Sequence, residues 1–290
     1  MKMKASLAAA GVISLLAVVC SAATAPPESA KALAEVKANR VEISYVAPAN
    51  PAHQQIYELL KTRRVLERFQ EALSPVRLPG TLMLKTEGCD GVSNAWYEVS
   101  EHAVSVCYEY IDEVLRNAPT KTTAAGITKQ DAIIGPTIEV FAHETAHALF
   151  DMLRVPILGR EEDAADQMAA YILLNHNKEM ARSTVNGVAF MYILEAQSQV
   201  QQMELKKFAD VHGLSAQRFY NLLCMAYGAD PKLFNDVVAK EYLPESRAEG
   251  CADEYKQVEY AFNTLLNPSV DQELKKKVKA KKLFKSLTEE

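Results

Sequence analysis

The stretch HETAHALFDMLRVPILGREEDAAD, residues 143–166, contains two helical patterns separated by a turn. Pro136 and Thr137 favour the start of a first helix, because proline is common in a first turn, and its apolar spacing continues to about Leu153. Pro156 and Gly159 then interrupt the pattern. The acidic sequence REED begins a second helix, with negative side chains where the helix dipole favours them. We therefore expect two helices that fold back along each other.

Two histidines of the first helix lie on the face opposite its apolar residues. At 100° per residue, His147 falls about 40° and Glu144 about 100° from His143. The apolar stripe lies between about 160° and 240° and consists of Ile138, Phe141, Thr145, Leu149 and Met152. Histidines kept for packing would lie within that stripe. Two imidazoles one turn apart can instead bind a single Zn²⁺.

The second helix offers the third ligand that a catalytic zinc needs. Glu162 follows His147 after a spacer long enough for the turn, and Asp166 lies one turn further on the same face. Asp166 is expected to accept the free ring N–H of His143 and so orient that ligand. Glu161 is the rival third ligand, but no carboxylate follows it four residues later.

The expected site has one catalytic Zn²⁺ and a fourth coordination position for water. Glu144, beside that position, would take a proton from the water and later deliver it to a leaving amine. The residues therefore predict hydrolysis of an amide.

Longer stretches support this interpretation by resemblance. The pattern His143-Glu144-x-x-His147 with Glu162-x-x-x-Asp166 resembles the gluzincin metallopeptidases, whose third zinc ligand is a glutamate on a following helix. The sequence HETAHALFDMLRVPILGREEDAADQMA, with NAWYEVS, VCYEY, RFYNLLCMAYG and LPESRAEGCADEY, is similar to a bacterial metallopeptidase family catalogued as a domain of unknown function. The likeness covers most of the chain and implies a zincin-like peptidase fold.

The N-terminus indicates export. Two lysines precede an apolar run at residues 8–19, which is short for a membrane span, and small residues follow. We expect a signal peptide at 1–25 and a periplasmic or secreted protein. Lipidation of Cys20 is the alternative, and the bulky Val19 before it disfavours that outcome.

Four cysteines remain after the signal peptide, and an even number in an exported protein predicts disulfides. The expected pairs are Cys89 with Cys107 and Cys224 with Cys251, because the members of each pair are close in sequence and flank one turn. A cysteine metal site is the alternative, but it would lack any C-x-x-C spacing.

Residues 26–290 predict one α+β domain with a small N-terminal sheet. A mixed part spans about 40–135, a helical part 136–268 and a basic tail 269–290. The first part contains strand patterns at 41–46, 80–89 and 102–110 and a helix at 51–73, and the aromatic pair Trp96 and Tyr97 lies between the last two strands. Further helices are expected at 186–208, 215–227, 230–240, 246–265 and in the tail.

The net charge of −5 disfavours nucleic acid as a main partner, and no other apolar run predicts a membrane span. The expected partner is a peptide or protein substrate. The run KKKVKAKKLFK at 275–285 permits a weak contact with an anionic envelope surface, and a frayed, solvated tail is the alternative.

The group that polarises the substrate carbonyl is harder to assign. His212, with Arg218 and Tyr220 nearby, is the candidate, and a capping or surface histidine is the alternative reading. Tyr108 and Tyr110 adjoin an expected edge strand that would bind an extended peptide, although core positions are the alternative. The remaining histidines are expected to be structural or solvated: His53, His102 and His176.

The resulting hypothesis is an exported zinc metallopeptidase in which Glu144 activates water. One alternative is a weak or inactive zinc-binding envelope protein that serves as a partner-binding scaffold, for which Glu144 would have no use. Another is a hydrolase of non-peptide amides in the envelope.

Overall fold

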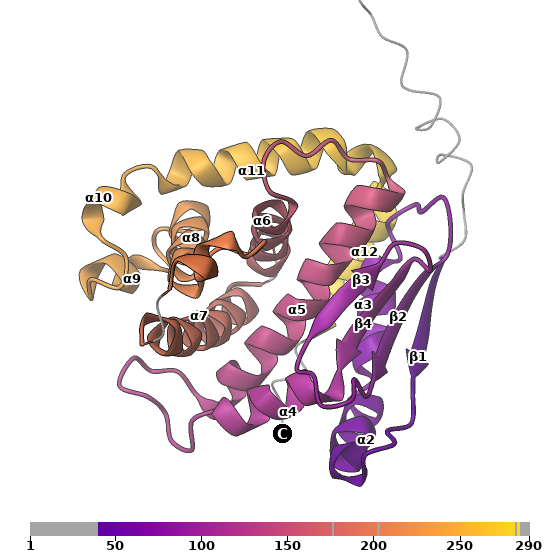
Figure 1. Cartoon of the computed structure of the whole chain (residues 1–290). Coiled ribbons are helices and arrows are strands. Elements are labelled where there is room, and N and C mark those ends of the chain that lie inside the picture. Colours follow the sequence, from indigo (N-terminus) through magenta and orange to yellow (C-terminus); the bar gives the residue numbers. More distant parts are fainter. Residues whose placement is uncertain (1–39, 176, 202–203, 282, 285–290) are drawn as a thin grey trace, which may run out of the picture.

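The computed structural model describes residues 40–175, 177–201, 204–281 and 283–284. The expected signal peptide, Cys20 and His176 lie outside these residues. The described chain is α+β, with a four-stranded sheet on one side and a larger group of helices on the other. The long helix α5 (Lys129–Met152) runs between them (Figure 1).

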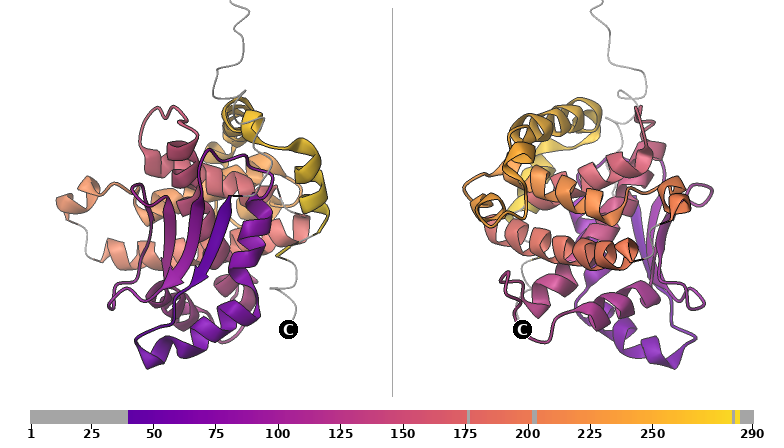
Figure 2. Two further views of the ribbon diagram at one scale, coloured as in Figure 1. Left: turned by 90° about the vertical axis from the view of Figure 1, so that its right-hand side faces the viewer. Right: turned by 60° about the vertical axis from the view of Figure 1, so that its left-hand side comes forward.

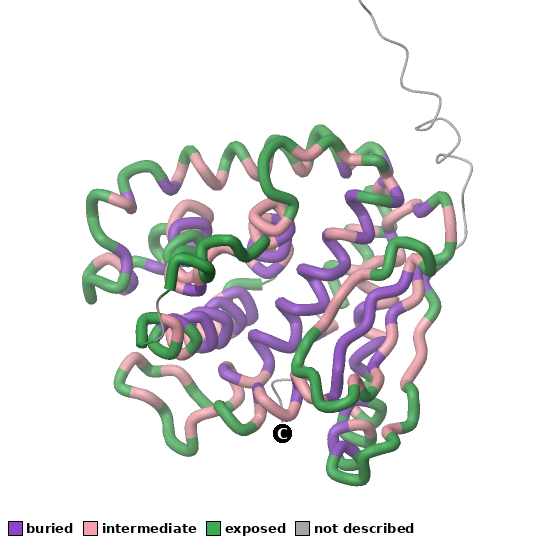
Figure 3. The backbone as a smooth tube through the Cα atoms, viewed as in Figure 1, coloured by how far each residue is buried: buried purple, intermediate pink, exposed green. Residues whose placement is uncertain are grey.

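The sheet has the order β1-β2-β4-β3. Its strands are β1 (Val41–Tyr45), β2 (Leu82–Glu87), β3 (Ala95–Glu98) and β4 (Ala103–Cys107). β1, β2 and β4 are parallel, and β3 runs antiparallel to β4. β4 is central and every one of its residues is buried, which Figure 3 shows beside the buried turns of α5.

Around this sheet the structure adds one strand that was not expected, and one expectation, about Tyr108 and Tyr110, is wrong. Trp96 and Tyr97 belong to an edge strand, β3, whose four residues are too few to show an alternating pattern. Tyr108 and Tyr110 do not extend the preceding strand but form the first turn of helix α4 (Tyr108–Asn117). The strand before these tyrosines, β4, is an inner strand, and the edge strand beside it is β3.

The single helix expected at 51–73 is broken in the structure. It consists of η1 (Pro51–His53), α2 (Gln54–Thr62) and α3 (Val65–Leu73), with Arg64 at a left-handed φ of 52°. In one straight helix, the buried Leu60 and Leu66 would lie about 120° apart. The break lets both apolar faces reach the core.

Helix α5 starts earlier than the proline predicts. Thr128 caps it, because its side chain accepts from the N–H of Asp131 while the Asp131 carboxylate accepts from the N–H of Thr128. This reciprocal cap determines the start, and Pro136 lies inside the helix at the expense of one backbone hydrogen bond.

Helix α7 (Lys178–Val200) crosses α5 where two glycines meet. A Cβ atom on Gly187 would lie 1.8 Å from the carbonyl oxygen of Asp131, and one on Gly135 would lie 2.8 Å from Cα of Gly187. The absence of side chains at these two positions is what allows the helices to approach so closely.

The other elements of the helical half pack together with α5 and α7 on the side of α5 away from β3 and β4 or at the ends of that group (Figure 2). Its elements are α6 (Glu161–Leu174), η2 (Leu205–Ala209), α8 (Ser215–Ala229), α9 (Asn235–Ala239), α10 (Glu245–Ala248), α11 (Cys251–Leu265), η3 (Asn267–Ser269) and α12 (Gln272–Ala280). The helix expected at 186–208 begins earlier, because Asn177 caps α7, and it ends at Val200. No helix in the described ranges is long and apolar enough to cross a bilayer.

The basic tail is not frayed over the residues that the structure describes. Helix α12 packs back against α3, the Lys281 ammonium donates to the Glu71 carboxylate, and the Phe284 ring lies 5.0 Å from that of Phe69. The apolar side chains within the lysine run hold it on the domain, which lysine content alone does not reveal.

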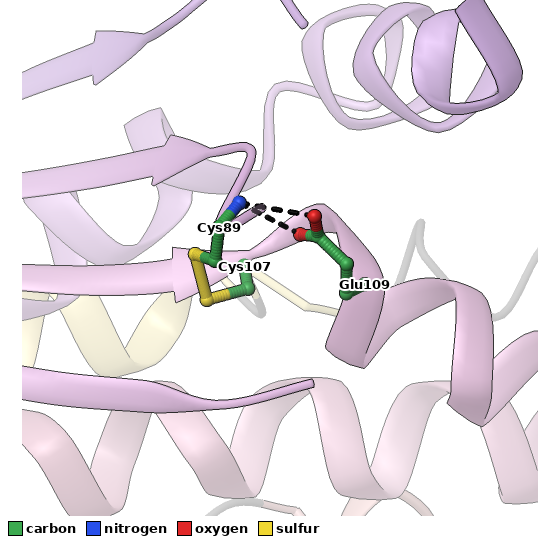
Figure 4. Close-up of side chains that lie close together, drawn as sticks. All are labelled: Cys89, Cys107 and Glu109. Carbon is green, nitrogen blue, oxygen red and sulfur yellow. Dashed lines mark hydrogen bonds between the residues drawn. A yellow bond between two sulfur atoms is a disulfide. The ribbon is translucent and has the colours of Figure 1, made fainter. Parts of the chain in front are cut away.

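Both expected disulfides are present. Cys89 joins Cys107, which ties the segment after β2 to the end of β4, and Cys224 joins Cys251, which ties α8 to α11. Beside the first disulfide, the Glu109 carboxylate accepts from the backbone N–H of Cys89 at 3.0 Å (Figure 4). The two cross-links lie in different halves of the fold.

Candidate metal centre

The candidate site lies where α5 and α6 pack against each other. α5 ends at Met152, and the connecting segment reverses the chain with Arg154 at a φ of 53° and Gly159 at a φ of 104°. α6 then begins at Glu161, so its first turn returns to the middle of α5. The turn expected from Pro156 and Gly159 is thus confirmed.

Three donor atoms converge between these helices. Oε2 of Glu162 lies 3.1 Å from Nε2 of His143 and 3.4 Å from Nε2 of His147, and the two Nε2 atoms are 3.2 Å apart. A tetrahedral ion with bonds of about 2.0–2.1 Å holds its ligands about 3.3 Å from one another. The donor set of two imidazoles and a carboxylate therefore fits one Zn²⁺ in both chemistry and spacing.

The other ring nitrogens of the histidines face carboxylates. Nδ1 of His143 lies 2.9 Å from Oδ1 of Asp166, although the angle falls short of an aligned hydrogen bond. Nδ1 of His147 lies 2.7 Å from Oε1 of Glu161. The rival third ligand is thus placed behind His147, away from the point where the three donor atoms converge. Sequence reasoning missed this contact because it looked for a partner only along α6.

Arg218 of α8 holds Asp166 in place. Its guanidinium donates two hydrogen bonds to the Asp166 carboxylate, at 2.6 and 2.7 Å, and lies 3.8 Å from Oε1 of Glu139. Tyr192 donates to Glu139 at 2.8 Å, and its ring lies under the guanidinium at 4.5 Å. The network connects α5, α6, α7 and α8 directly behind His143.

His212 reaches the site from the segment between η2 and α8. Its Nε2 lies 3.0 Å from Oε2 of Glu162, and its ring stacks against that of His143 with centroids 6.1 Å apart. The side chain is 44% exposed, so it lies at the open side of the cluster. His212 is therefore a surface histidine, as the alternative has it, and its ring lies beside Glu162 and His143.

Of the other residues singled out in the sequence, some lie at the site and some do not. Tyr110 lines the cavity at the site, whereas Tyr108 is buried in the core and bonds to β-sheet carbonyls. Tyr220 is exposed and is not part of the cavity wall. His53 is buried beside Tyr108, and Nε2 of His102 lies 3.8 Å from Oδ2 of Asp151. Neither histidine contributes to the cavity wall at the site.

The charges within the cluster stabilise one another. Burial acts to lower the pKa of His143, but its contacts with Asp166 and Glu162 outweigh burial and raise that pKa to about 10. The contact with His143 lowers the pKa of Glu162 to about 2. For Asp166, burial acts upward, but His143 and Arg218 prevail and its pKa falls to about 2. In the metal-free cluster the carboxylates are thus ionised beside a protonated His143, and a bound metal would have to displace that proton.

Glu144 faces a cavity of about 550 Å³ beside the donor atoms. Its side chain is buried, and its carboxylate forms no hydrogen bond with any residue that the structure describes. Burial raises the pKa of Glu144, while the two neighbouring histidines act in the opposite direction. Strand β3 forms one wall through Trp96 and Tyr97. The arrangement offers an ionisable group, a cavity and a set of metal ligands in one place.

These features define the class of site: a histidine and carboxylate centre on an H-E-x-x-H helix that is suited to a divalent metal. The model of a family described as "Putative metallopeptidase" matches residues 45–266, and the chain belongs to this family. The matched range includes strands β2 to β4, both helices of the centre and α8. No curated protein and no solved structure matches the chain.

Proposed function

We propose that the protein is a zinc-dependent metallopeptidase that hydrolyses peptide bonds. The observation that carries this proposal is the convergence of Nε2 of His143, Nε2 of His147 and Oε2 of Glu162 within 3.1–3.4 Å of one another. The free carboxylate of Glu144 beside them adds the general base that hydrolysis needs. The α+β architecture, with a sheet edge next to the H-E-x-x-H helix, agrees with a zincin-like fold.

In this proposal His143, His147 and Glu162 bind one Zn²⁺. Asp166 orients His143 and Glu161 orients His147, since each carboxylate faces the ring nitrogen that does not bind the metal. When bound, zinc supplies Lewis-acid chemistry that lowers the pKa of water to about 7.

Glu144 accepts the proton of the attacking water and passes it to the nitrogen of the leaving amine. Its buried position supports this role, because a carboxylate with a raised pKa keeps a proton more readily between the two steps. His212 would donate from Nε2 to the substrate carbonyl oxygen, where negative charge develops. Its partly exposed place at the open side of the cluster supports contact with substrate.

Strand β3 provides a route for substrate binding. Among the described strands it pairs only with β4, so its outer edge has backbone groups available to an extended peptide. Trp96 and Tyr97 of this strand line the cavity. A peptide added along β3 would pass directly over the H-E-x-x-H helix, since α5 contacts β3.

We further propose that residues 26–290 form one exported domain after removal of a signal peptide at 1–25. The two disulfides support an oxidising compartment, periplasmic or extracellular. The family match, which runs from strands β2 to β4 through α11, supports a single domain.

The proposal is tested by comparing the protein with its Glu144→Gln variant. We expect about one zinc per chain by elemental analysis in both, and hydrolysis of an unfolded protein substrate that falls at least about 100-fold in the variant. Glu179→Gln, on the exposed surface of α7, is the matched control and should change neither quantity. Absence of zinc would remove the metal centre, and unchanged hydrolysis in Glu144→Gln would remove the catalytic role.

The position of His212 also favours a second candidate, a closed zinc site in a scaffold protein. Because its Nε2 lies 3.0 Å from Glu162, it could supply a fourth protein ligand, as structural zinc sites have. His212→Ala separates the two. For the enzyme, hydrolysis should fall while zinc affinity changes less than about tenfold. For the closed site, zinc affinity should fall more than about 100-fold, and the unaltered protein should have no hydrolytic activity.

A further inference from the structure

A second cavity lies on the side of α5 that faces away from the metal centre. It has a volume of about 220 Å³ and lies between α3, α5, α6, α11 and α12. Its wall is almost entirely apolar and includes Phe69, Leu149, Met168, Tyr171, Phe262 and Val278. A cavity of about 150 Å³ with a similar lining is large enough for benzene. This one can therefore hold a longer hydrocarbon group.

Two lysines of α12 lie at the rim of this cavity. Lys275 and Lys279 are one helical turn apart, and the Lys275 ammonium lies 5.4 Å from the ring centroid of Phe262 in the wall. Burial lowers the pKa of Lys275, and the positive charge of Lys279 lowers it further. The ammonium of Lys275 thus lies in poorly solvated surroundings next to a second cation.

Neither of these two lysines has a carboxylate partner among the described residues, and the Lys275 ammonium donates to Oδ1 of Asn267 at 3.5 Å. Other lysines in or beside the same helix do pair: Lys276 with Glu273 at 2.8 Å, and Lys281 with Glu71. Lys275 and Lys279 therefore place positive charge without a carboxylate partner at the cavity mouth.

We infer that this cavity binds a single-chain amphiphile with an anionic headgroup, of the fatty acid type with about eight to twelve carbons. The hydrocarbon tail occupies the apolar cavity, and the carboxylate lies between Lys275 and Lys279. The charge complementarity at the rim selects an anionic headgroup, and the lining selects an apolar tail. This inference is independent of the proposed peptidase activity, because no residue of the metal centre takes part.

The geometry predicts a dependence on chain length. Each methylene buried in the cavity contributes about 0.8 kcal/mol, so each added carbon should lower the dissociation constant about fourfold until the cavity is full. Loss of the headgroup charge should weaken binding about tenfold or more, because the two ammonium groups then lose their only anionic partner.

The test uses octanoate, decanoate and laurate below their micellar concentrations, with displacement of a fluorescent fatty acid as the readout. We expect affinity to rise along the series and dodecanol to bind at least about tenfold more weakly than laurate. Lys275→Gln with Lys279→Gln should reduce laurate binding at least about tenfold and leave dodecanol unchanged. Lys277→Gln, on the same helix but outside the cavity wall, should change neither.

Ala72→Phe, in the wall of the cavity, should fill it and abolish binding of both ligands, and Val278→Trp is a second filling variant. Circular dichroism identifies a variant that fails to fold. In that case, ligand binding by the other filling variant tests the inference. Laurate binding that persists in a folded filling variant would overturn the inference, as would an unaltered protein that binds no laurate. Binding to anionic phospholipid vesicles without any laurate binding would show that the lysines contact a membrane surface, and would also overturn it.

Discussion

Replacing Glu162 by glutamine should cost the protein most of its affinity for zinc, whereas the same replacement at the preceding Glu161 should cost little. The two side chains are neighbours in the first turn of α6 but face different nitrogens. Oε2 of Glu162 lies 3.1 and 3.4 Å from the two converging Nε2 atoms, and Oε1 of Glu161 lies 2.7 Å from Nδ1 of His147. The pair therefore provides a matched comparison within one helical turn.

The magnitudes follow from these positions. Removing a group that orients a metal ligand typically costs 10–100-fold in affinity, or about 1.4–2.7 kcal/mol. Glutamine at position 161 can still accept from Nδ1 of His147, and the glutamate side chain there is 54% exposed, so the loss should be about tenfold or less. A neutral amide at 162 is a poor zinc ligand, and the loss should exceed about 100-fold.

Competition with a chelating dye at neutral pH measures both affinities directly. The shift of the unfolding midpoint on adding zinc provides a second measure, because it depends on ligand concentration over the dissociation constant. Equal losses in the two variants, or a larger loss in Glu161→Gln, would refute the ligand assignment and would favour Glu161 as the third ligand.

Three further predictions concern stability. Gly187→Ala should lower the free energy of unfolding in urea by about 3 kcal/mol or more, because its Cβ would lie 1.8 Å from the Asp131 carbonyl oxygen. The control Gly250→Ala, whose Cβ would lie in open space, should change that free energy by less than about 0.5 kcal/mol. Arg218→Met should cost roughly 3 kcal/mol in metal-free protein, since it removes both guanidinium hydrogen bonds of the largely buried Asp166 carboxylate and leaves it only the contact with His143; a neutral or stabilising effect would contradict this account of the network. Reduction of the two disulfides, whose partners are 18 and 27 residues apart, should cost about 3 kcal/mol each, and calorimetry under reducing conditions should show a lower unfolding temperature.

The candidate centre could be predicted from the sequence to the extent that it depends on helical periodicity. His143 and His147 share a face because they are four residues apart, and Glu162 and Asp166 share a face for the same reason. A short turn between two helices then leaves few ways for these faces to meet. The disulfides could also be predicted from the sequence, because each closes a local loop.

Contacts between segments far apart in the chain could not be predicted from the sequence. The bond between Arg218 and Asp166 joins residues 52 positions apart, and nothing in the local pattern of α8 marks that arginine as a partner. His212 could be proposed from its residue type, but only the fold places its Nε2 beside Glu162. The contact of Glu161 with His147 depends on the relative rotation of two packed helices.

Competing local and tertiary signals explain the errors in the predicted secondary structure. Pro136 suggested a helix start, but the capping pair Thr128 and Asp131 determines it earlier, and the long buried helix tolerates the proline. Strand β3 was missed because its four residues obtain their strand conformation from pairing with β4.

The sequence by itself determined the H-E-x-x-H helix, the turn at Pro156 and Gly159, the acidic helix start and the α+β class, because each follows from periodicity and backbone preference over a few residues. Only the tertiary structure decided which donor atoms meet, which carboxylate lies behind each histidine, and that an apolar cavity with two uncompensated lysines lies behind α5. These outcomes depend on how helices far apart in the chain pack, and packing follows from the shapes of whole surfaces, which no short stretch encodes.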